Sequence, residues 1–183
     1  MEENTLLEKK IEGEVVFQGP LIRVEHWKAE LVNGKHAFRE IVCHNGAAVI
    51  AAVDAEGRVT LVSQYRIAMG RILLELPAGK RDTEEEDMLL CAKRELEEET
   101  GLLARSWVQL TTLDTSPGFL TERIGLYLAT DLYQGTVHPD EDEFLHITKM
   151  PLAEAVALVM QGKITDAKTI AGLLMAKEYL QDR

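Results

Sequence analysis

Glutamates crowd the segment KRELEEETGL at residues 93–102, and this crowding constrains the fold more than any other feature of the sequence. In a helix with about 100° per residue, Glu98 and Glu99 fall within about 60° of Glu95, so three carboxylates share one stripe. Like charges at i,i+4 repel by roughly 0.2–0.5 kcal/mol per pair. The stripe therefore indicates either a solvated acidic face or a site for a cation.

The helix that carries this stripe is predicted over residues 84–100. Leu89, Ala92 and Leu96 recur at helical spacing, so they form one apolar face that can be buried. Gly101 follows at the position where a helix commonly ends in a left-handed residue. Burial of the apolar face would fix the rotation of the helix and, with it, the direction of the carboxylates.

Hydrophobic alternation predicts strands on both sides of this helix. Residues 11–44 read as an antiparallel meander with a turn at Asn33-Gly34. Further strands are predicted at 46–53, 58–66, 72–79 (broken by Pro77 and Gly79), 107–115, 123–132 and before 150. Two closing helices are predicted at 151–163 and 167–180, the second capped by Thr165 or Asp166.

This order of elements predicts an α/β (α+β) fold, in which helices cover the faces of a mixed sheet. We expect two parts, an N-terminal strand region at 1–44 and a main domain at 45–183. The chain has 183 residues, of which 46% are hydrophobic, enough for one substantial core.

The formal charge of −11 argues against non-specific binding to nucleic acid or to an acidic membrane, because the chain has no basic surplus. The apolar run at 47–53 is too short to span a bilayer, and the charged N-terminus does not resemble a signal peptide. Cys43 and Cys91 form no disulfide framework, and we expect both to be buried thiols. A cytoplasmic protein is the default expectation.

The segment GKRDTEEEDMLLCAKRELEEETGL resembles the Nudix box, the signature of the Nudix hydrolases. Eight positions match in register: Glu86, Arg94, Glu95, Leu96, Glu98, Glu99, Gly101 and Leu102. Six residues rather than five separate Gly79 from Glu86. We expect the additional residue in the loop at 80–85, because an insertion in the helix would rotate the carboxylates away from one another.

A stripe of carboxylates suits hard cations such as Mg²⁺ or Mn²⁺. The resemblance implies that Glu95 and Glu99, with Glu98 beside them, hold the metal together with the carbonyl of Ala78, which a tight turn at Gly79 would present. Glu98 is also a candidate catalytic residue. Arg94 lies one turn before Glu98, where it can neutralise and orient that carboxylate.

Features outside the box resemble the ADP-ribose pyrophosphatase branch of the family. Pro117 lies sixteen residues after Gly101, and SQYR leads into ELPAG before the box. The strands at 11–44 resemble a region through which such enzymes form dimers with shared active sites. The resemblance therefore implies a Nudix α/β/α sandwich, a homodimer, and hydrolysis of the small nucleotide ADP-ribose to AMP and ribose 5-phosphate.

Candidate substrate-binding residues follow from the same resemblance, with Pro117 as the mark of the branch. Arg66 is expected to contact the phosphate or ribose, although it also fits a surface ion pair. Glu75 is expected at the terminal ribose or as a plain strand-end carboxylate. Trp27 fits adenine stacking, and also a core or interface position. Arg23 and Arg39 fit either phosphate contacts across the dimer or the protein surface.

The catalytic base is expected in the acidic segment PDEDEF at 139–144. Glu141 is the first candidate and Glu143 the second, since a loop carboxylate can reach the attacking water when the loop closes. The alternative is an acidic turn exposed to solvent.

Two other functions remain open at this point. One is a Nudix enzyme acting on another nucleoside diphosphate derivative, such as a sugar nucleotide or a dinucleotide. The other is a non-catalytic module that binds a nucleotide and regulates a partner.

Overall fold

The computed structural model describes residues 6–135 and 144–182, and the chain separates into two compact units. The first unit contains residues 1–46 and 114–123, and the second contains 47–113 and 124–183. The predicted division into a dimerisation region at 1–44 and a hydrolase domain at 45–183 remains a prediction about function.

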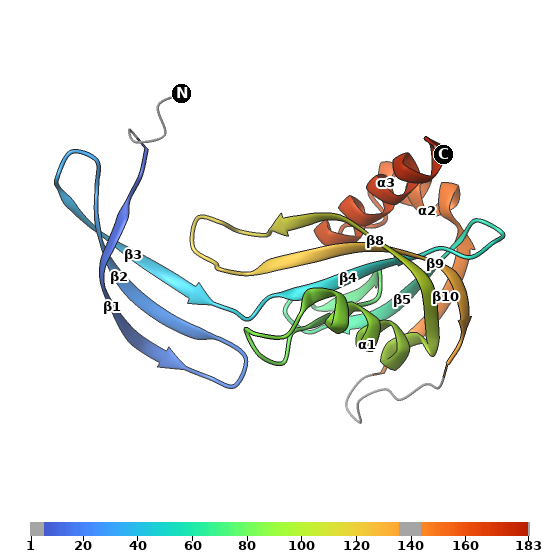
Figure 1. The fold of residues 1–183 in the computed structure, drawn as a ribbon, viewed down its shortest axis with the longest axis horizontal. Coiled ribbons are helices and arrows are strands. Elements are labelled where there is room, and N and C mark those ends of the chain that lie inside the picture. The colour runs from blue at the N-terminus through green and yellow to red at the C-terminus, as the bar shows by residue number, and fades with distance from the viewer. Residues whose placement is uncertain (1–5, 136–143, 183) are drawn as a thin grey trace. The chain divides into compact units, whose positions relative to one another are not determined.

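The first unit is built on a three-stranded antiparallel sheet in the order β1-β2-β3 (Figure 1). The strands are β1 Lys9–Gln18, β2 Arg23–Glu30 and β3 His36–Cys43. Gly34 makes the turn before β3 with φ 75°, which confirms the predicted hairpin. The segment 114–123 is attached to β3, because the Val42 N–H donates to the Phe119 carbonyl at 2.7 Å.

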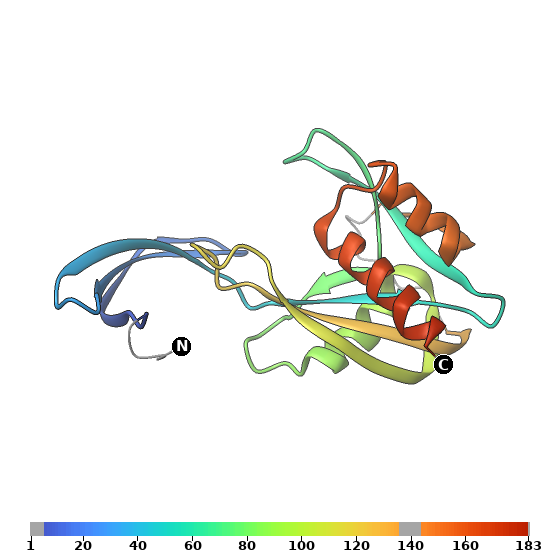
Figure 2. The ribbon, with the colours of Figure 1, turned by 90° about the horizontal axis from the view of Figure 1, so that it is seen from above.

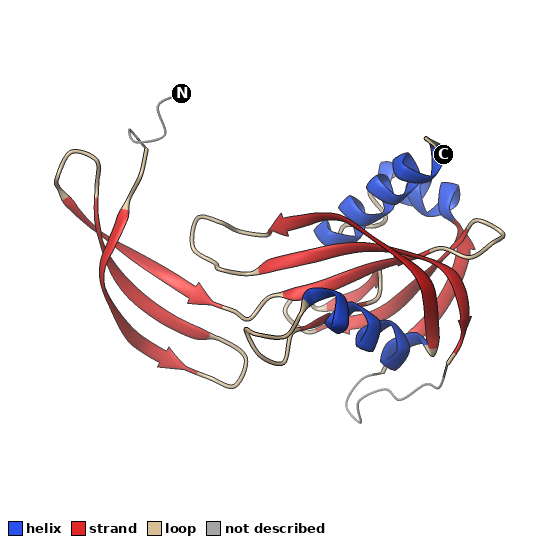
Figure 3. Cartoon of the chain, viewed as in Figure 1, coloured by secondary structure: helices blue, strands red, loops and turns tan. Residues whose placement is uncertain are grey.

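The second unit contains two sheets (Figure 3). The four-stranded sheet has the order β7-β4-β9-β8, with β4 parallel to β9 and antiparallel to β7. The three-stranded sheet has the order β10-β5-β6. The strands are β4 Ala47–Ala52, β5 Arg58–Arg66, β6 Arg71–Glu75, β7 Ala78–Lys80, β8 Leu102–Asp114, β9 Arg123–Gln134 and β10 His146–Pro151.

Three helices complete the second unit: α1 Met88–Thr100, α2 Leu152–Met160 and α3 Ala167–Gln181. Asp87 caps α1 by accepting from the backbone of Leu89 and Leu90. Asp166, one of the two predicted candidates, caps α3 by accepting from the Thr169 N–H. Helix α1 begins later than predicted, because residues 84–86 are held in the preceding loop.

The buried strand β4 divides the core into two layers. Ala48 and Ile50 pack with Ala92 and Leu96 of α1, whereas the alternate residues of β4 pack with α2 and α3. Figure 2 shows α1 and the α2–α3 pair on opposite sides of β4. This arrangement confirms the predicted α/β/α sandwich with a mixed sheet, and it buries the apolar face of α1.

The cysteines and the helices bear on two further expectations from the sequence. Cys91 is buried, but Cys43 is only half-buried, since it ends the strand β3 in the first unit. Across the described residues, we find no helix with the length and apolar character needed to cross a membrane.

Candidate active site

The glutamate stripe lies along α1 as the sequence predicts. Leu96 is fully buried on the core side, and Gly101 ends the helix with φ 67° and an N–H bonded to the Glu97 carbonyl at 2.7 Å. Glu95 and Glu99 are buried, at 8% and 5% exposure. Packing of the apolar face of α1 therefore fixes the rotation of the helix about its axis and the direction of the glutamate stripe.

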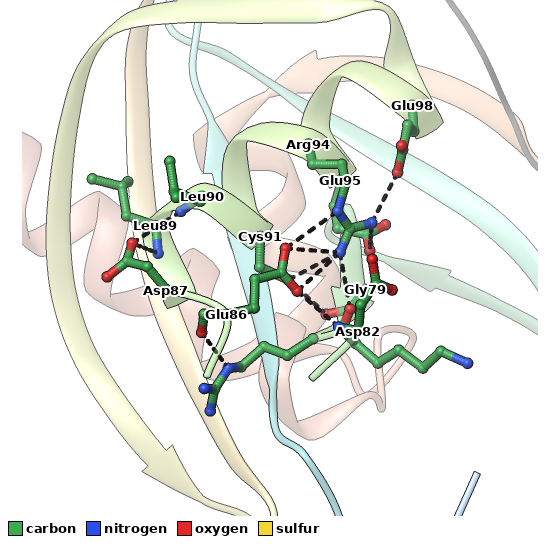
Figure 4. A network of polar contacts seen from close by, with 12 residues as sticks. Gly79, Asp82, Glu86, Asp87, Leu89, Leu90, Cys91, Arg94, Glu95 and Glu98 are labelled. Atoms are coloured by element: carbon green, nitrogen blue, oxygen red, sulfur yellow. Dashed lines mark hydrogen bonds and ion pairs between the residues drawn. The ribbon is translucent and has the colours of Figure 1, made fainter. Parts of the chain in front are cut away.

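Arg94 occupies the centre of this carboxylate cluster (Figure 4). One guanidinium nitrogen, Nη1, donates to Glu95 Oε1 at 2.7 Å and to Glu98 Oε2 at 3.0 Å. The other nitrogens, Nε and Nη2, reach Glu86 Oε1 at 3.3 Å. Arg94 thus neutralises and orients Glu98, as expected. It also binds the carboxylates of Glu86 and Glu95.

The additional residue before Glu86 lies in the loop between β7 and α1. The Glu86 carboxylate accepts from the Asp82 N–H at 2.7 Å, and its carbonyl accepts from Arg81 Nε at 2.6 Å. Arg81 also bonds to the Glu84 carbonyl. The loop closes on itself through these bonds, so that α1 continues without interruption from Met88 to Thr100.

Gly79 is required for a close approach and not for the tight turn that the sequence suggested. It lies in β7 and is absent from the glycines with positive φ. A Cβ at this position would lie 1.9 Å from Cδ of Glu95. Next to it, the Ala78 N–H donates to Glu99 Oε2 at 3.1 Å. Strand β7 therefore lies directly against two carboxylates of the stripe.

The pKa values of Arg94 and Glu86 both shift in the direction that favours the charged form. Burial acts to lower the pKa of Arg94, but the charge of Glu95 and the hydrogen bonds that Arg94 donates to three carboxylates outweigh it and raise that pKa above its usual value. Burial acts to raise the pKa of Glu86, but bonds from Asp82 and Arg94 lower it overall. Burial raises the pKa of the neighbouring Cys91 to about 12, so that thiol stays protonated.

The donor set fits a hard divalent cation by its chemistry. Glu95, Glu98 and Glu99 supply carboxylate oxygens from one helix face, and Ala78 lies beside them with a backbone carbonyl. Within residues 6–135 and 144–182, no three acidic, His or Cys side chains are arranged as a metal site. The carboxylates are instead held by Arg94 and the Ala78 N–H, so metal binding requires them to turn from these partners.

A second charged cluster forms where β5, β6 and α3 meet. Arg66 donates from Nε and Nη2 to the two oxygens of Glu75, both at 2.8 Å. Lys168 Nζ donates to Glu75 Oε2 at 2.5 Å and to Asp166 Oδ2 at 3.0 Å. Glu75 is 1% exposed and both its oxygens are engaged, so it holds Arg66 in place and presents no free oxygen to a ligand.

The Arg66 cluster is electrostatically connected to the stripe. The hydrogen bonds that Arg66 donates to Glu75 raise the pKa of Arg66 against the effect of burial, and the charges of Glu99 and Asp166 raise it further. Burial acts to raise the pKa of Glu75, yet its bonds to Arg66 and the charge of Lys168 lower it overall.

The remaining predicted substrate residues belong to the first unit. Glu25 accepts from the Trp27 indole N–H at 2.6 Å and from Arg23 Nε at 2.7 Å. Lys10 Nζ lies 3.9 Å from the centre of the Trp27 ring, so one face of the indole is already covered. Arg39 pairs with Glu8 at 2.7 Å, as in the surface alternative.

Pro117 is an exposed residue of the turn between β8 and β9. Glu141 and Glu143 lie outside the described residues, so their assignment as candidate bases remains a prediction.

Sequence reasoning missed Lys168, although one signal was available. A lysine in the first turn of a helix lies at the positive end of the helix dipole, which is unfavourable without a nearby anion. Asp166, one of the two candidate caps, was already such an anion. The second anion, Glu75, is distant in the sequence.

Comparison with known proteins decides the family. The NUDIX domain model matches residues 44–173, which include the whole box and both charged clusters. The chain belongs to the Nudix family. As a Nudix hydrolase, it is 40% identical over 181 residues to an ADP-ribose pyrophosphatase of Bacillus subtilis (strain 168), with 97% of each chain covered.

Two further relatives broaden the comparison of this Nudix hydrolase. It is 38% identical over 176 residues to a methanol dehydrogenase activator of Bacillus methanolicus, covering 95% of this chain and 92% of that one. The crystal structure of an ADP compounds hydrolase aligns with a TM-score of 0.84 and 25% identity, covering 96% and 95%. The family and these relatives support hydrolysis of a nucleoside diphosphate derivative.

Proposed function

We propose that this protein hydrolyses the diphosphate of ADP-ribose to AMP and ribose 5-phosphate, with Mg²⁺ or Mn²⁺ as cofactor. The observation that carries the proposal is the stripe of Glu95, Glu98 and Glu99 around Arg94, on a helix whose rotation is fixed by packing. Pro117 and the names of two relatives, an ADP-ribose pyrophosphatase and an ADP compounds hydrolase, support the choice of substrate.

In the second unit, one set of residues would bind the metal cation and another would bind the anionic substrate. Glu95, Glu98, Glu99 and the Ala78 carbonyl would hold the metal, and Arg94 keeps two of these carboxylates oriented. When bound, the metal neutralises the diphosphate and lowers the pKa of the attacking water. Arg66, fixed by Glu75, would bind the charged middle of the substrate.

The base is proposed in the acidic segment 139–144. Glu141 would accept a proton from the attacking water, with Glu143 as the second candidate. We expect Glu141→Gln to lower kcat by orders of magnitude and Glu143→Gln to leave it nearly unchanged. The reverse result would reassign the base.

We also propose a homodimer formed through the first unit. Strand β1 is exposed along its whole length, and Val15 and Phe17 are among its exposed apolar residues. A three-stranded sheet with such uncovered apolar surface favours association. In that dimer, the uncovered face of Trp27 would stack on adenine, and Arg23 and Arg39 would lie near the phosphates.

The function is tested by a phosphate-release screen with Mg²⁺, in which phosphatase reveals newly exposed monophosphates and EDTA is the control. The panel contains ADP-ribose, NADH, ADP-glucose, GDP-mannose, a diadenosine polyphosphate and an oxidised dGTP. We expect ADP-ribose to lead by at least about tenfold in kcat/KM. A different leading substrate would contradict the ADP-ribose assignment and retain the Nudix chemistry.

The relative called a methanol dehydrogenase activator favours a second candidate function, regulation of a partner enzyme. If the protein acts only as a binding module, every substrate in the panel should remain intact. The retained Glu95, Glu98 and Glu99 argue against this candidate, since a module without catalysis has no need of a metal-binding stripe.

A further inference from the structure

We propose that Lys168 is a positioning residue, which holds Glu75 and, through it, Arg66 in the orientation that binds the anionic part of the substrate. The inference rests on the proposed function, because it assumes that Arg66 meets a negatively charged group. It adds a residue from the C-terminal helix α3, outside the Nudix box, to the determinants of substrate affinity.

The geometry of Arg66 leaves one edge of its guanidinium available to a ligand. Arg66 places Nε and Nη2 on the two oxygens of Glu75, and Nη1 makes no hydrogen bond within the described part of the chain. The Arg66 side chain is 41% exposed and the Glu75 side chain only 1%. The free edge of the guanidinium is therefore the edge available to a ligand, and its direction depends on where Glu75 is held.

Glu75 is held from the other side by α3. Lys168 Nζ reaches Glu75 Oε2, and the Leu76 N–H donates to Thr169 Oγ1 at 2.8 Å. Asp166 in turn accepts from Thr169 Oγ1 at 2.6 Å and from Lys168 Nζ. The first turn of α3 thus fixes two consecutive residues, Glu75 at the end of β6 and Leu76 directly after it, shortly before Ala78.

Lys168 also sets the charge of the cluster around Glu75. Arg66 and Lys168 face Glu75 and Asp166, so two cations balance two carboxylates. Without Lys168, one cation would face two carboxylates, and the cluster would carry a charge of −1 beside Glu99. An anionic ligand would then meet repulsion where it now meets the free edge of Arg66.

Lys168 lies in the first turn of α3, an unusual position for a lysine. A lysine in the first turn faces the positive end of the helix dipole, and its half-buried side chain loses rotamer freedom. Its position is favourable because Glu75 and Asp166 lie within hydrogen-bond distance. These two carboxylates therefore explain why a lysine is tolerated in the first turn of α3.

The test compares Lys168→Met with Lys177→Met, which removes a lysine of the same helix that has no ion pair in the described structure. We expect Lys168→Met to raise KM for ADP-ribose about tenfold and to change kcat less than threefold, because Arg66 binds rather than reacts. Lys168→Arg should keep KM within about threefold of wild type. Lys177→Met should leave both constants unchanged.

A double variant separates positioning from general stability. If Lys168 acts by holding and neutralising Glu75, its removal should matter little once Glu75 is neutral. We expect Lys168→Met to change KM less than twofold in a Glu75→Gln background. Should Lys168→Met not fold, Lys168→Gln, which keeps a donor without the charge, is expected to give the same tenfold rise.

Several outcomes would overturn the inference. A KM for Lys168→Met or Lys168→Gln within twofold of wild type would remove the role of Lys168 and leave the proposed function standing. An undiminished effect in the Glu75→Gln background would show that Lys168 does not act through Glu75. A wild-type protein that neither hydrolyses ADP-ribose nor binds it by calorimetry in EDTA would overturn both proposals.

Discussion

The two arginine clusters of the second unit differ in their balance of charge. Arg94 faces three carboxylates, Glu86, Glu95 and Glu98, so one cation meets three anions and the cluster carries −2. At the second cluster, Arg66 and Lys168 balance Glu75 and Asp166. The first cluster is suited to a further cation, whereas the second leaves an arginine edge free for an anion.

This difference would allow one small domain to hold the proposed metal ion at the acidic cluster and the proposed diphosphate at Arg66. Negative charge in excess attracts a cation only if the carboxylates are held together, and Arg94 holds them without cancelling them. A balanced cluster avoids the cost of an uncompensated buried charge, which Glu75 would otherwise impose. Arg94 therefore acts by orienting carboxylates, whereas Arg66 is itself oriented by Glu75.

The largest expected effect comes from breaking the acidic cluster. We expect Glu99→Gln to lower kcat by at least about 100-fold while the melting temperature changes little, because the change removes a proposed ligand together with its repulsion of Glu95. Steady-state kinetics and thermal unfolding check this. Glu97→Gln, on the opposite side of α1, is the matched control, and near-normal turnover in Glu99→Gln would contradict the metal assignment.

A smaller effect is expected from displacing one carboxylate without removing it. Gly79→Ala places a methyl group where Cδ of Glu95 now lies, so that the flexible end of Glu95 must move. We expect kcat/KM to fall roughly 10- to 100-fold, with only a small decrease in melting temperature. Unchanged activity would mean that the position of Glu95 against β7 is not needed for catalysis.

The balanced cluster is tested by Arg66→Lys. Lysine keeps the positive charge but cannot place two parallel donors on Glu75, so the cation loses its fixed direction. We expect KM for ADP-ribose to rise about tenfold, with kcat reduced less. Arg58→Lys is the matched control, since Arg58 begins the same strand and pairs with Asp54 at an exposed turn. Equal KM values for both variants would refute a substrate role for Arg66.

The smallest effect concerns a third cluster, in the first unit, and is read from stability. Hydrogen bonds from Trp27, Lys10 and Arg23 lower the pKa of Glu25 from an ordinary 4.5 to about 2, although burial opposes them. The stabilisation by this carboxylate is complete above its unfolded pKa and is lost as the pH falls toward 2. We expect Glu25→Gln to cost about 1–2 kcal/mol at pH 7.

The pH dependence makes this prediction specific. The difference in unfolding free energy between wild type and Glu25→Gln should shrink as the pH falls from about 4.5 to about 2. Denaturant titration followed by Trp27 fluorescence in a Trp107→Phe background would measure it. A difference that stays constant over this range would show that the ionised carboxylate is not the source of the stability.

Much of the fold was predictable from the sequence because its signals are local. The alternation of the strands, the turn at Gly34 and the caps Asp166 and Gly101 all depend on residues a few positions apart. The start of α1 was predicted too early. Residues before Asp87 have helical composition, but Arg81 and Asp82 bond to Glu86 and hold the segment as a loop.

The sequence by itself determined the acidic stripe, because the period of the helix places Glu95, Glu98 and Glu99 together and sets Arg94 one turn before Glu98. Only the tertiary structure decided which residues distant in the sequence contact these charged side chains. Lys168 meets Glu75 across 93 residues, and Gly79 of β7 makes room for Glu95 of α1 across the loop that joins them. No local period connects such residues; they meet because packing of α1 and α3 on opposite sides of the sheet brings buried charges within reach of their partners.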